Sequence, residues 1–102
     1  MKSIEFNKVY TFKLNSGEEL IAKAIGHDIE CGELIISDPV SIAPGPQGMG
    51  LVPSMFTANP KSEHRLNTSS VALYAETEDS VKDKYTEATT GIQLPEKKLV
   101  LG

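Results

Sequence analysis

Four residues in two short segments carry the side chains of a metal or thiol site. His27, Asp28 and Cys31 lie close together at a turn, and His64 lies in a later polar segment. Imidazole nitrogen and thiolate sulfur are common zinc ligands, and a thiol beside a base is a common nucleophile. A zinc site would need a second nitrogen or sulfur pair at close spacing, and no base is placed to orient the thiol. We therefore predict a structural turn in which Asp28 caps backbone amides, with no metal ion, no cofactor and no catalytic residue.

The central region contains one basic segment, formed by Lys61, His64 and Arg65. Arg65 is the sole arginine of the chain, and arginine is the usual residue for planar anion recognition, so the segment is a candidate phosphate contact. Glu63 interrupts it, and a solvated loop is the simpler interpretation. The net charge of −4 has the wrong sign for a protein that covers a phosphate backbone.

Length and composition indicate one domain with a modest core. The 102 residues are 39% hydrophobic, so burial at a subunit interface would add stability. The single cysteine excludes an intrachain disulfide and fits a reducing interior. The first residues lack the apolar run of a signal peptide, and no segment has the apolar length of a membrane span. We expect a soluble, cytoplasmic protein.

The polar and apolar pattern predicts strands at 9–15, 19–27, 33–42, 51–58 and 71–76. Gly17 is expected to take a positive φ in a hairpin turn, and Gly26 to permit a bulge. Pro39 argues for an edge position or a break in the third strand. The segment 43–50 is expected to be a loop, and 64–66 to hold a strand extension.

The period changes after the last strand. Val81, Tyr85 and Ala88 lie at helical spacing, with Asp79 as the expected cap and Gly91 as the expected stop. The division is then a β-barrel at 1–76, a helix at 77–91 and a tail at 92–102. The tail is either frayed or docked on a neighbour through Leu99-Val100-Leu101.

Leu14, Gly17, Leu20 and Asp28 follow a recognisable spacing: glycine at +3, an apolar residue at +6 and aspartate at +14. This spacing resembles the first motif of the Sm-like proteins (LSm and Hfq-related). The order of elements and the short length resemble small Sm-like proteins of bacteriophages, including those of marine cyanobacteria, which would place the protein in the host cytoplasm. The resemblance implies an all-β fold, a small five-stranded, strongly bent Sm-like or SH3-like barrel with a short C-terminal helix over its open end. An OB-type barrel is the alternative.

The resemblance also implies an RNA pocket between two loops. The first loop would contribute His27, Asp28, Glu30 and Gly32, and the second would contribute Lys61, His64, Arg65 and Asn67. Asn67 would read a base edge, and Arg65 or Lys61 would hold a phosphate. Glu30 stands where the family has an aromatic or histidine, and Gly32 where it has asparagine. The family's basic residue and glycine before the last strand are replaced by Asn67-Thr68-Ser69-Ser70.

In Sm-like rings the fourth strand pairs with the fifth strand of the next subunit. That arrangement implies an interface built from two groups of residues, Leu51, Val52, Met55 and Phe56 on one strand and Val71, Leu73 and Tyr74 on the other. Alternatively, the methionine-rich stripe from Met49 to Phe56 binds a protein partner. The sequence therefore predicts a non-catalytic, ring-forming Sm-like protein associated with RNA. The alternative is a protein-interaction or scaffold module of a phage or host assembly that binds no RNA.

Overall fold

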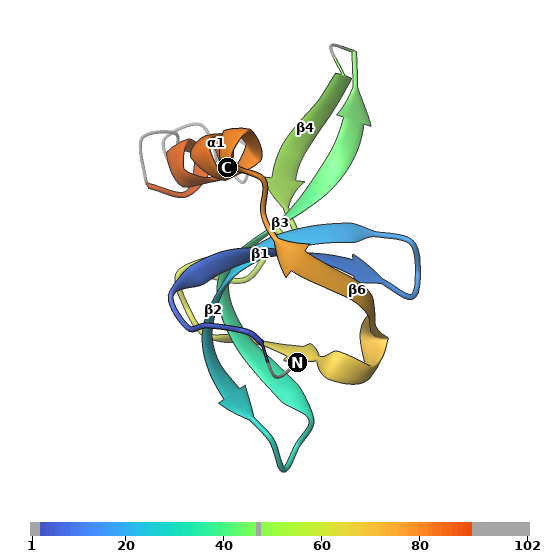
Figure 1. Ribbon diagram of the computed structural model, residues 1–102. Helices are drawn as coiled ribbons and strands as arrows, with labels where there is room; N and C mark the ends of the chain where they lie inside the picture. The colour runs from blue at the N-terminus through green and yellow to red at the C-terminus, as the bar shows by residue number, and fades with distance from the viewer. Residues whose placement is uncertain (1–2, 47, 91–102) are drawn as a thin grey trace.

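The computed structural model describes residues 3–46 and 48–90, and within them the protein is mostly β-structure with one helix (Figure 1). The strands are β1 (Lys8–Leu14), β2 (Glu19–Asp28), β3 (Glu33–Gly45), β4 (Gly48–Pro53), β5 (His64–Asn67) and β6 (Val71–Glu76). A 3₁₀ turn, η1 (Thr68–Ser70), joins β5 to β6, and α1 (Asp79–Thr89) follows β6. The prediction of an all-β fold with a C-terminal helix is confirmed at this level.

The six strands form one antiparallel sheet in the order β4-β3-β2-β1-β6. Strand β3 is long enough to have two partners along its outer edge, because β5 pairs with Glu33–Ile36 and β4 pairs with Val40–Gly45. The expected strand extension at 64–66 is therefore a strand in its own right. The prediction of five strands is wrong for this reason, and the sheet has six.

The two partners of β3 are separated by a bulge at Asp38 and Pro39. Ile21 pairs with Val40 and Lys23 pairs with Ser37, so Asp38 and Pro39 together oppose the single residue between Ile21 and Lys23. Asp38 has a φ of 52°, a left-handed conformation that aspartate tolerates better than most residues. The predicted break at Pro39 is confirmed, because proline is tolerated where a bulge interrupts the ladder.

Beyond this bulge, β3 and β4 form a hairpin that projects from the rest of the sheet (Figure 1). We call this hairpin, Val40 to Pro53, the arm. Its ladder continues to the pair of Gly45 and Gly48, so the prediction of a loop at 43–50 is wrong. The limits of the predicted strand at 51–58 are also wrong, because β4 runs from Gly48 to Pro53. Pro44 lies on a two-stranded ribbon with an open edge, where a missing amide is tolerated, and Pro46 lies in the turn after β3.

The sheet has apolar clusters on both faces. Tyr10, Phe12 and Leu34 belong to the larger cluster, whose other fully buried members are Leu20, Ala22, Ala24 and Ile36. Ile21 and Val40 point to the opposite face, since neighbouring strand residues alternate between faces. There they pack against Tyr85 of α1. We expected the helix over the open end of a barrel, whereas its one buried residue covers this second face.

Helix α1 differs from its prediction at the start. It begins at Asp79, and its N-cap residue is Glu78, which makes no side-chain capping bond. Asp79 lies in the first turn, where its charge complements the helix dipole without capping. The expected stop at Gly91 and the tail at 92–102 lie outside the described residues. Within the described ranges, no helix has the length and apolar character that a membrane crossing requires.

Candidate functional site

The structure brings together the two loops that the sequence predicts to form a pocket. Asp28 pairs with Glu33 across the β2–β3 hairpin, and Glu33 pairs with Asn67 of β5. Directly paired residues lie on the same face of a sheet, so these three side chains share one face. Arg65, two residues along β5, shares that face too. We call Asp28, Cys31, Glu33 and Arg65 the Arg65 cluster.

Two acidic neighbours engage Arg65 through one of its guanidinium nitrogens. Its Nη1 lies 3.3 Å from Asp28 Oδ2 and 3.1 Å from Glu33 Oε1, with all three side chains partly exposed. The hydrogen bond to Glu33 raises the pKa of the guanidinium above its already high value. One cation therefore faces two anions, and the cluster as a whole is negative. A phosphate approaching Arg65 would meet two carboxylates that already hold it.

The first loop is held by its own backbone and by η1. The amide of Cys31 donates to Asp28 Oδ1 at 3.2 Å, so Asp28 does cap a backbone amide. This bond, together with Arg65, lowers the pKa of Asp28 below its ordinary value. Gly32 has a φ of 67°, which favours glycine. Its carbonyl accepts from the amide of Thr68 at 3.0 Å and from the Thr68 hydroxyl at 2.9 Å.

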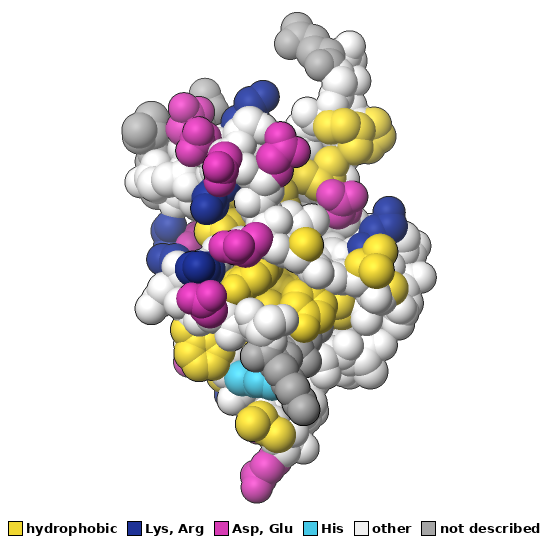
Figure 2. Space-filling view, viewed as in Figure 1, with side chains coloured by type: hydrophobic (Ala, Val, Ile, Leu, Met, Phe, Trp, Pro, Cys, Tyr) yellow, Lys and Arg dark blue, Asp and Glu magenta, His cyan; other side chains and the backbone are white. Residues whose placement is uncertain are grey.

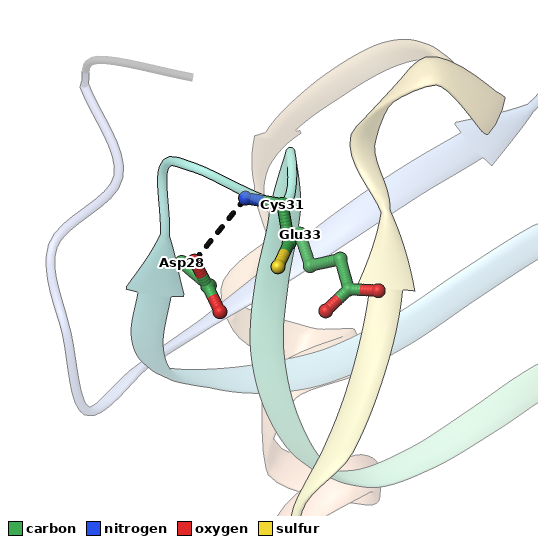
Figure 3. A group of neighbouring side chains, drawn as sticks. All are labelled: Asp28, Cys31 and Glu33. Carbon is green, nitrogen blue, oxygen red and sulfur yellow. Dashed lines mark hydrogen bonds between the residues drawn. The ribbon is translucent and has the colours of Figure 1, made fainter.

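Among the described residues, Asp28, Cys31 and Glu33 form the group most like a metal site (Figure 3). One ligand atom from each lies within 4.8 Å of the others. The arrangement does not fit a metal ion, for two reasons. The Arg65 guanidinium already occupies the space between the two carboxylates. Asp28 and Glu33 raise the pKa of the Cys31 thiol, which keeps it protonated and makes it both a poor ligand and a poor nucleophile.

Other residues of the predicted pocket are separated from the cluster. His27 pairs with Leu34, and His64 pairs with Ile36, so both histidines lie on the face of the larger apolar cluster. The Nδ1 of His64 lies 3.0 Å from the carbonyl oxygen of Ser62. Glu30 is exposed at the hairpin turn. The histidines therefore do not join Cys31, as a zinc or nucleophile site would require.

Asn67 has a local structural role. Its side chain is the cap of η1, where Oδ1 accepts from the amide of Ser69 at 3.0 Å and from the Ser69 hydroxyl at 2.8 Å. Because this oxygen is engaged twice, it is not free to accept from a base edge. The resemblance implied that Asn67 reads a base edge, whereas in the structure its side-chain oxygen accepts two hydrogen bonds from Ser69.

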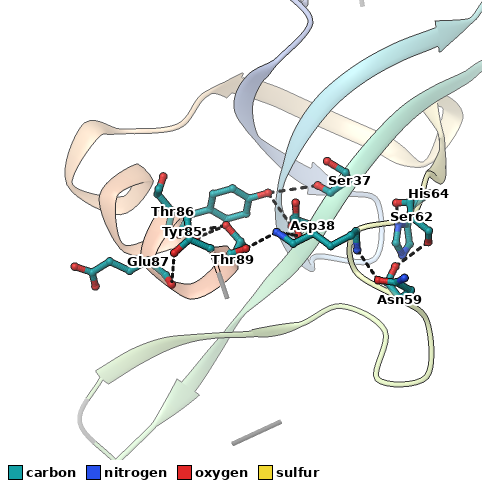
Figure 4. A network of polar contacts seen from close by, with 11 residues as sticks. Ser37, Asp38, Asn59, Ser62, His64, Tyr85, Thr86, Glu87 and Thr89 are labelled. Atoms are coloured by element: carbon teal, nitrogen blue, oxygen red, sulfur yellow. Dashed lines mark hydrogen bonds and ion pairs between the residues drawn. The ribbon is translucent and has the colours of Figure 1, made fainter. Parts of the chain in front are cut away.

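Lys61 belongs to a second polar network, on the side of α1, through its contacts with Asp38 and Thr89. Figure 4 shows these two partners together with Tyr85. The Nζ of Lys61 lies 3.1 Å from Asp38 Oδ1 and donates to the carbonyl of Thr89. The hydroxyl of Tyr85 donates to the carbonyls of Asp38 and Ser37 at 2.8 and 3.3 Å. A lysine at the C-terminal end of a helix is favoured by the helix dipole. Lys61 thus ties α1 to the bulge of β3, which is a structural role rather than a phosphate contact.

The predicted interface residues divide between two strands and one loop. Leu51 and Val52 lie in β4, Val71, Leu73 and Tyr74 lie in β6, and Met55 and Phe56 follow the end of β4. Leu73, Met55 and Phe56 have large exposed fractions of 68%, 51% and 64%. Leu51, Val71 and Tyr74 instead pack against the apolar clusters. The exposed members remain available to another chain.

Sequence reasoning missed Glu33 and Asp38, which are the partners that engage Arg65 and Lys61. Glu33 could have been found from the predicted hairpin, because it lies opposite Asp28 across a four-residue turn. Asp38 carried the signal of an aspartate before a proline in a strand, which favours a bulge. No sequence signal places Lys61 beside it.

A scan of the chain against protein-family models gives no match, and a search of the curated proteins gives none either.

Proposed function

We propose that this protein is a non-catalytic, self-assembling scaffold subunit whose copies join through the free edges of their sheets. The observation that carries the proposal is the position of β4 and β6 at the two ends of the strand order. In the described part of the chain, β4 pairs only with β3, and β6 pairs only with β1. Each therefore presents a row of unpaired backbone groups.

Open edges of this kind promote pairing with another chain, and proteins usually shorten, charge or cover them. The centre of strand β6 carries neither a charge nor a cover, because its side chain there is Leu73, which is 68% exposed. Pairing β4 of one copy with β6 of the next would satisfy both edges with a head-to-tail contact. Such contacts close into a ring when the rotation between subunits allows it. This arrangement also agrees with the Sm-like resemblance of Leu14, Gly17, Leu20 and Asp28, in which the fourth strand pairs with the last.

The charges favour a scaffold over an RNA-binding ring. Arg65 is neutralised by Asp28 and Glu33, and Lys61 is engaged by Asp38 and Thr89. Figure 2 shows acidic and basic side chains interspersed on the visible face, without a basic stripe. A protein that binds the phosphate backbone of RNA needs cationic side chains that are free to replace the counterions of the RNA. The alternative function, an RNA-associated ring, would rest on these same engaged residues.

The test is the oligomeric state of two matched variants, measured by sedimentation velocity. Leu73→Lys places a charge on the free edge of β6, which blocks edge pairing. Ile29→Lys makes the same chemical change at an exposed turn residue, 79% accessible, away from either edge. We expect wild type and Ile29→Lys to be oligomeric and Leu73→Lys to be monomeric and folded. A monomeric wild type, or an oligomer that Leu73→Lys leaves intact, would refute the proposal.

A further inference from the structure

The longest uncharged stretch of the chain coincides with the arm and the loop that follows it. Residues 39–60 contain no aspartate, glutamate, lysine, arginine or histidine, although charged residues make up 24% of the chain. Met49, on the arm, is 68% exposed. The core of a protein interface is poor in charged residues and rich in methionine and aromatic residues. The arm therefore has the composition of a surface that another chain covers.

One face of the arm is hollow. Directly paired residues point to the same side of a sheet, and three pairs with mostly small or absent side chains point to this face: Ser41 with Val52, Ala43 with Gly50, and Gly45 with Gly48. An open hollow of about 450 Å³ lies here, with Ala43, Gly50 and Val52 in its lining. A Cβ added at Gly50 would have room, because the nearest atom beyond its chain neighbours, among the described residues, is the carbonyl oxygen of Ala43 at 4.0 Å.

A side chain suited to this hollow lies on the other free edge of the sheet. Leu73 is 68% exposed at the centre of β6, and residues 71–75 of that strand are uncharged. Leu73 pairs with Lys13, which points to the same side as Ile21 of the second apolar cluster. Leu73 therefore points to the face that α1 covers. Gly50 lies on the opposite face.

The topology of the sheet decides how these two edges can meet. Five antiparallel strands lie along the path from β4 to β6, so these two edge strands run in the same direction. A neighbouring copy that offers β6 to β4 can join in parallel, with the two faces continuous across the junction. It can also join antiparallel, but reversing β6 without changing the edge it offers turns that copy over and exchanges its faces. Only the antiparallel junction brings Leu73 to the side of Gly50.

We propose that Leu73 of one copy inserts into the hollow at Gly50 of the next copy, across an antiparallel junction of β6 with β4. This inference rests on the proposed assembly and specifies its central contact. Antiparallel pairs are somewhat more stable than parallel pairs and are more common. In a parallel junction, Leu73 would instead lie beside Leu51 or Met49, whose own side chains take up the space on that face.

One register of this junction suits both strands. With Leu73 opposite Gly50, β4 pairs through all of its residues except Pro53, and β6 through all of its residues except Glu76. Pro53 has no amide to donate to a ladder, and Glu76 is the charged residue of β6. A shift of two residues in one direction brings both into the ladder. The same shift in the other direction leaves half of β4 unpaired.

This register also covers the exposed methionine of the arm. Met49 precedes Gly50, so in the antiparallel junction it lies opposite Tyr74 of the neighbouring copy. Tyr74 packs against the larger apolar cluster in its own copy, and the exchange of faces brings it to the side of Met49. Sulfur beside an aromatic ring is a favourable contact. Met49 and Leu73, each 68% exposed in the single chain, are then covered at one junction.

Cysteine crosslinking between two variants tests the contact. Both variants carry Cys31→Ser, and one adds Gly50→Cys while the other adds Leu73→Cys. A disulfide between them in a mildly oxidised mixture must join two chains, and we expect a covalent dimer on a non-reducing gel. Directly paired strand residues have Cβ atoms close enough for a disulfide. The matched control mixes Leu51→Cys with Leu73→Cys, a pair that only the parallel junction would join.

An exchange of side-chain size tests the same contact without a covalent bond. Gly50→Val should fill the hollow, and Leu73→Ala should leave it empty. We expect each change to raise the dissociation constant of the assembly about tenfold in sedimentation velocity. The double variant should recover most of that loss, because the smaller side chain at position 73 fits beside the filled hollow.

The outcomes separate this contact from the assembly on which it rests. An assembled wild type in which the control pair crosslinks instead, or in which neither pair does, would overturn the inference and leave the edge-to-edge assembly standing. Additive losses in the double variant would count equally against it. A monomeric wild type would refute the proposed assembly itself, and the contact with it.

Discussion

The hydroxyl of Tyr85 is the contact that most directly ties α1 to the sheet, and its removal has a calculable cost. Tyr85 is 3% exposed, and its ring packs with Ile21 and Val40. The change Tyr85→Phe keeps that packing and removes the donor to the carbonyls of Asp38 and Ser37. A net hydrogen bond contributes about 1 kcal/mol, and a buried carbonyl left without a donor adds to the loss, so we expect about 1–2 kcal/mol in total.

The assay is urea unfolding followed by circular dichroism. With a slope of about 1.5 kcal/mol/M, typical of a small domain, the loss lowers the urea midpoint by roughly 1 M and leaves the slope unchanged. Tyr74→Phe is the matched control, because the one hydrogen bond of the Tyr74 hydroxyl within residues 3–46 and 48–90 is to the Ser3 hydroxyl, at 3.3 Å in an exposed position. Its expected effect is under about 0.5 kcal/mol. Equal midpoints for wild type and Tyr85→Phe would refute the claim that this contact holds the helix.

Three further outcomes follow from the charges and contacts. Because the pKa of Asp28 is lower in the folded chain than its ordinary 3.8, the unfolded chain takes up that proton first, and stability present at neutral pH is lost as the pH falls through this range. Asp28→Asn should therefore show a smaller fall in urea midpoint between pH 6 and pH 3 than wild type, and an equal fall would contradict the assignment. Burial raises the pKa of Tyr85 above its ordinary 10.0, so the unfolded chain ionises first and stability falls above pH 10. Thermal melts of Tyr85→Phe should show a smaller loss between pH 9 and pH 11 than wild type, and an identical loss would count against a buried neutral hydroxyl. Fluorescence anisotropy should show no salt-dependent affinity for oligouridine, and binding that weakens as salt rises would restore the RNA-associated function.

The sequence predicted the elements whose signals are local. Alternation in β1, β2 and β6 and the helical spacing of Val81 and Tyr85 were sufficient to place those elements within a few residues. Gly17 has the expected positive φ, of 95°, and the expected bulge at Gly26 appears as a register shift between Ala24 and Gly26. Hairpin turns and bulges are set by neighbouring residues, so a short window of sequence contains their signal.

The arm could not be predicted in the same way. Pro44, Gly45 and Gly48 are poor strand residues, and they form a ladder as the continuation of β3, which β2 holds as far as Ser41 and which β4 follows from there to its end. That is a tertiary effect, which overrides local preference. Sheet registers also decide which charges meet, so Arg65 looked free in the sequence although Glu33 and Asp28 hold it in the fold.

The loops of the candidate site were predicted to meet, and they do, through Gly32 and Thr68. What could not be predicted was the negative net charge of the cluster that forms where they meet. Only the paired registers of β2, β3 and β5 show that two carboxylates share a face with one guanidinium while both histidines point to the other side.

The central claim, a scaffold that assembles through sheet edges without RNA, is tested most directly by native mass spectrometry on protein purified without nuclease. We predict a discrete oligomer that carries no nucleotide mass and that becomes monomeric in Leu73→Lys. A monomeric wild type would contradict the edge-to-edge assembly, and an oligomer carrying nucleotide would contradict the absence of RNA.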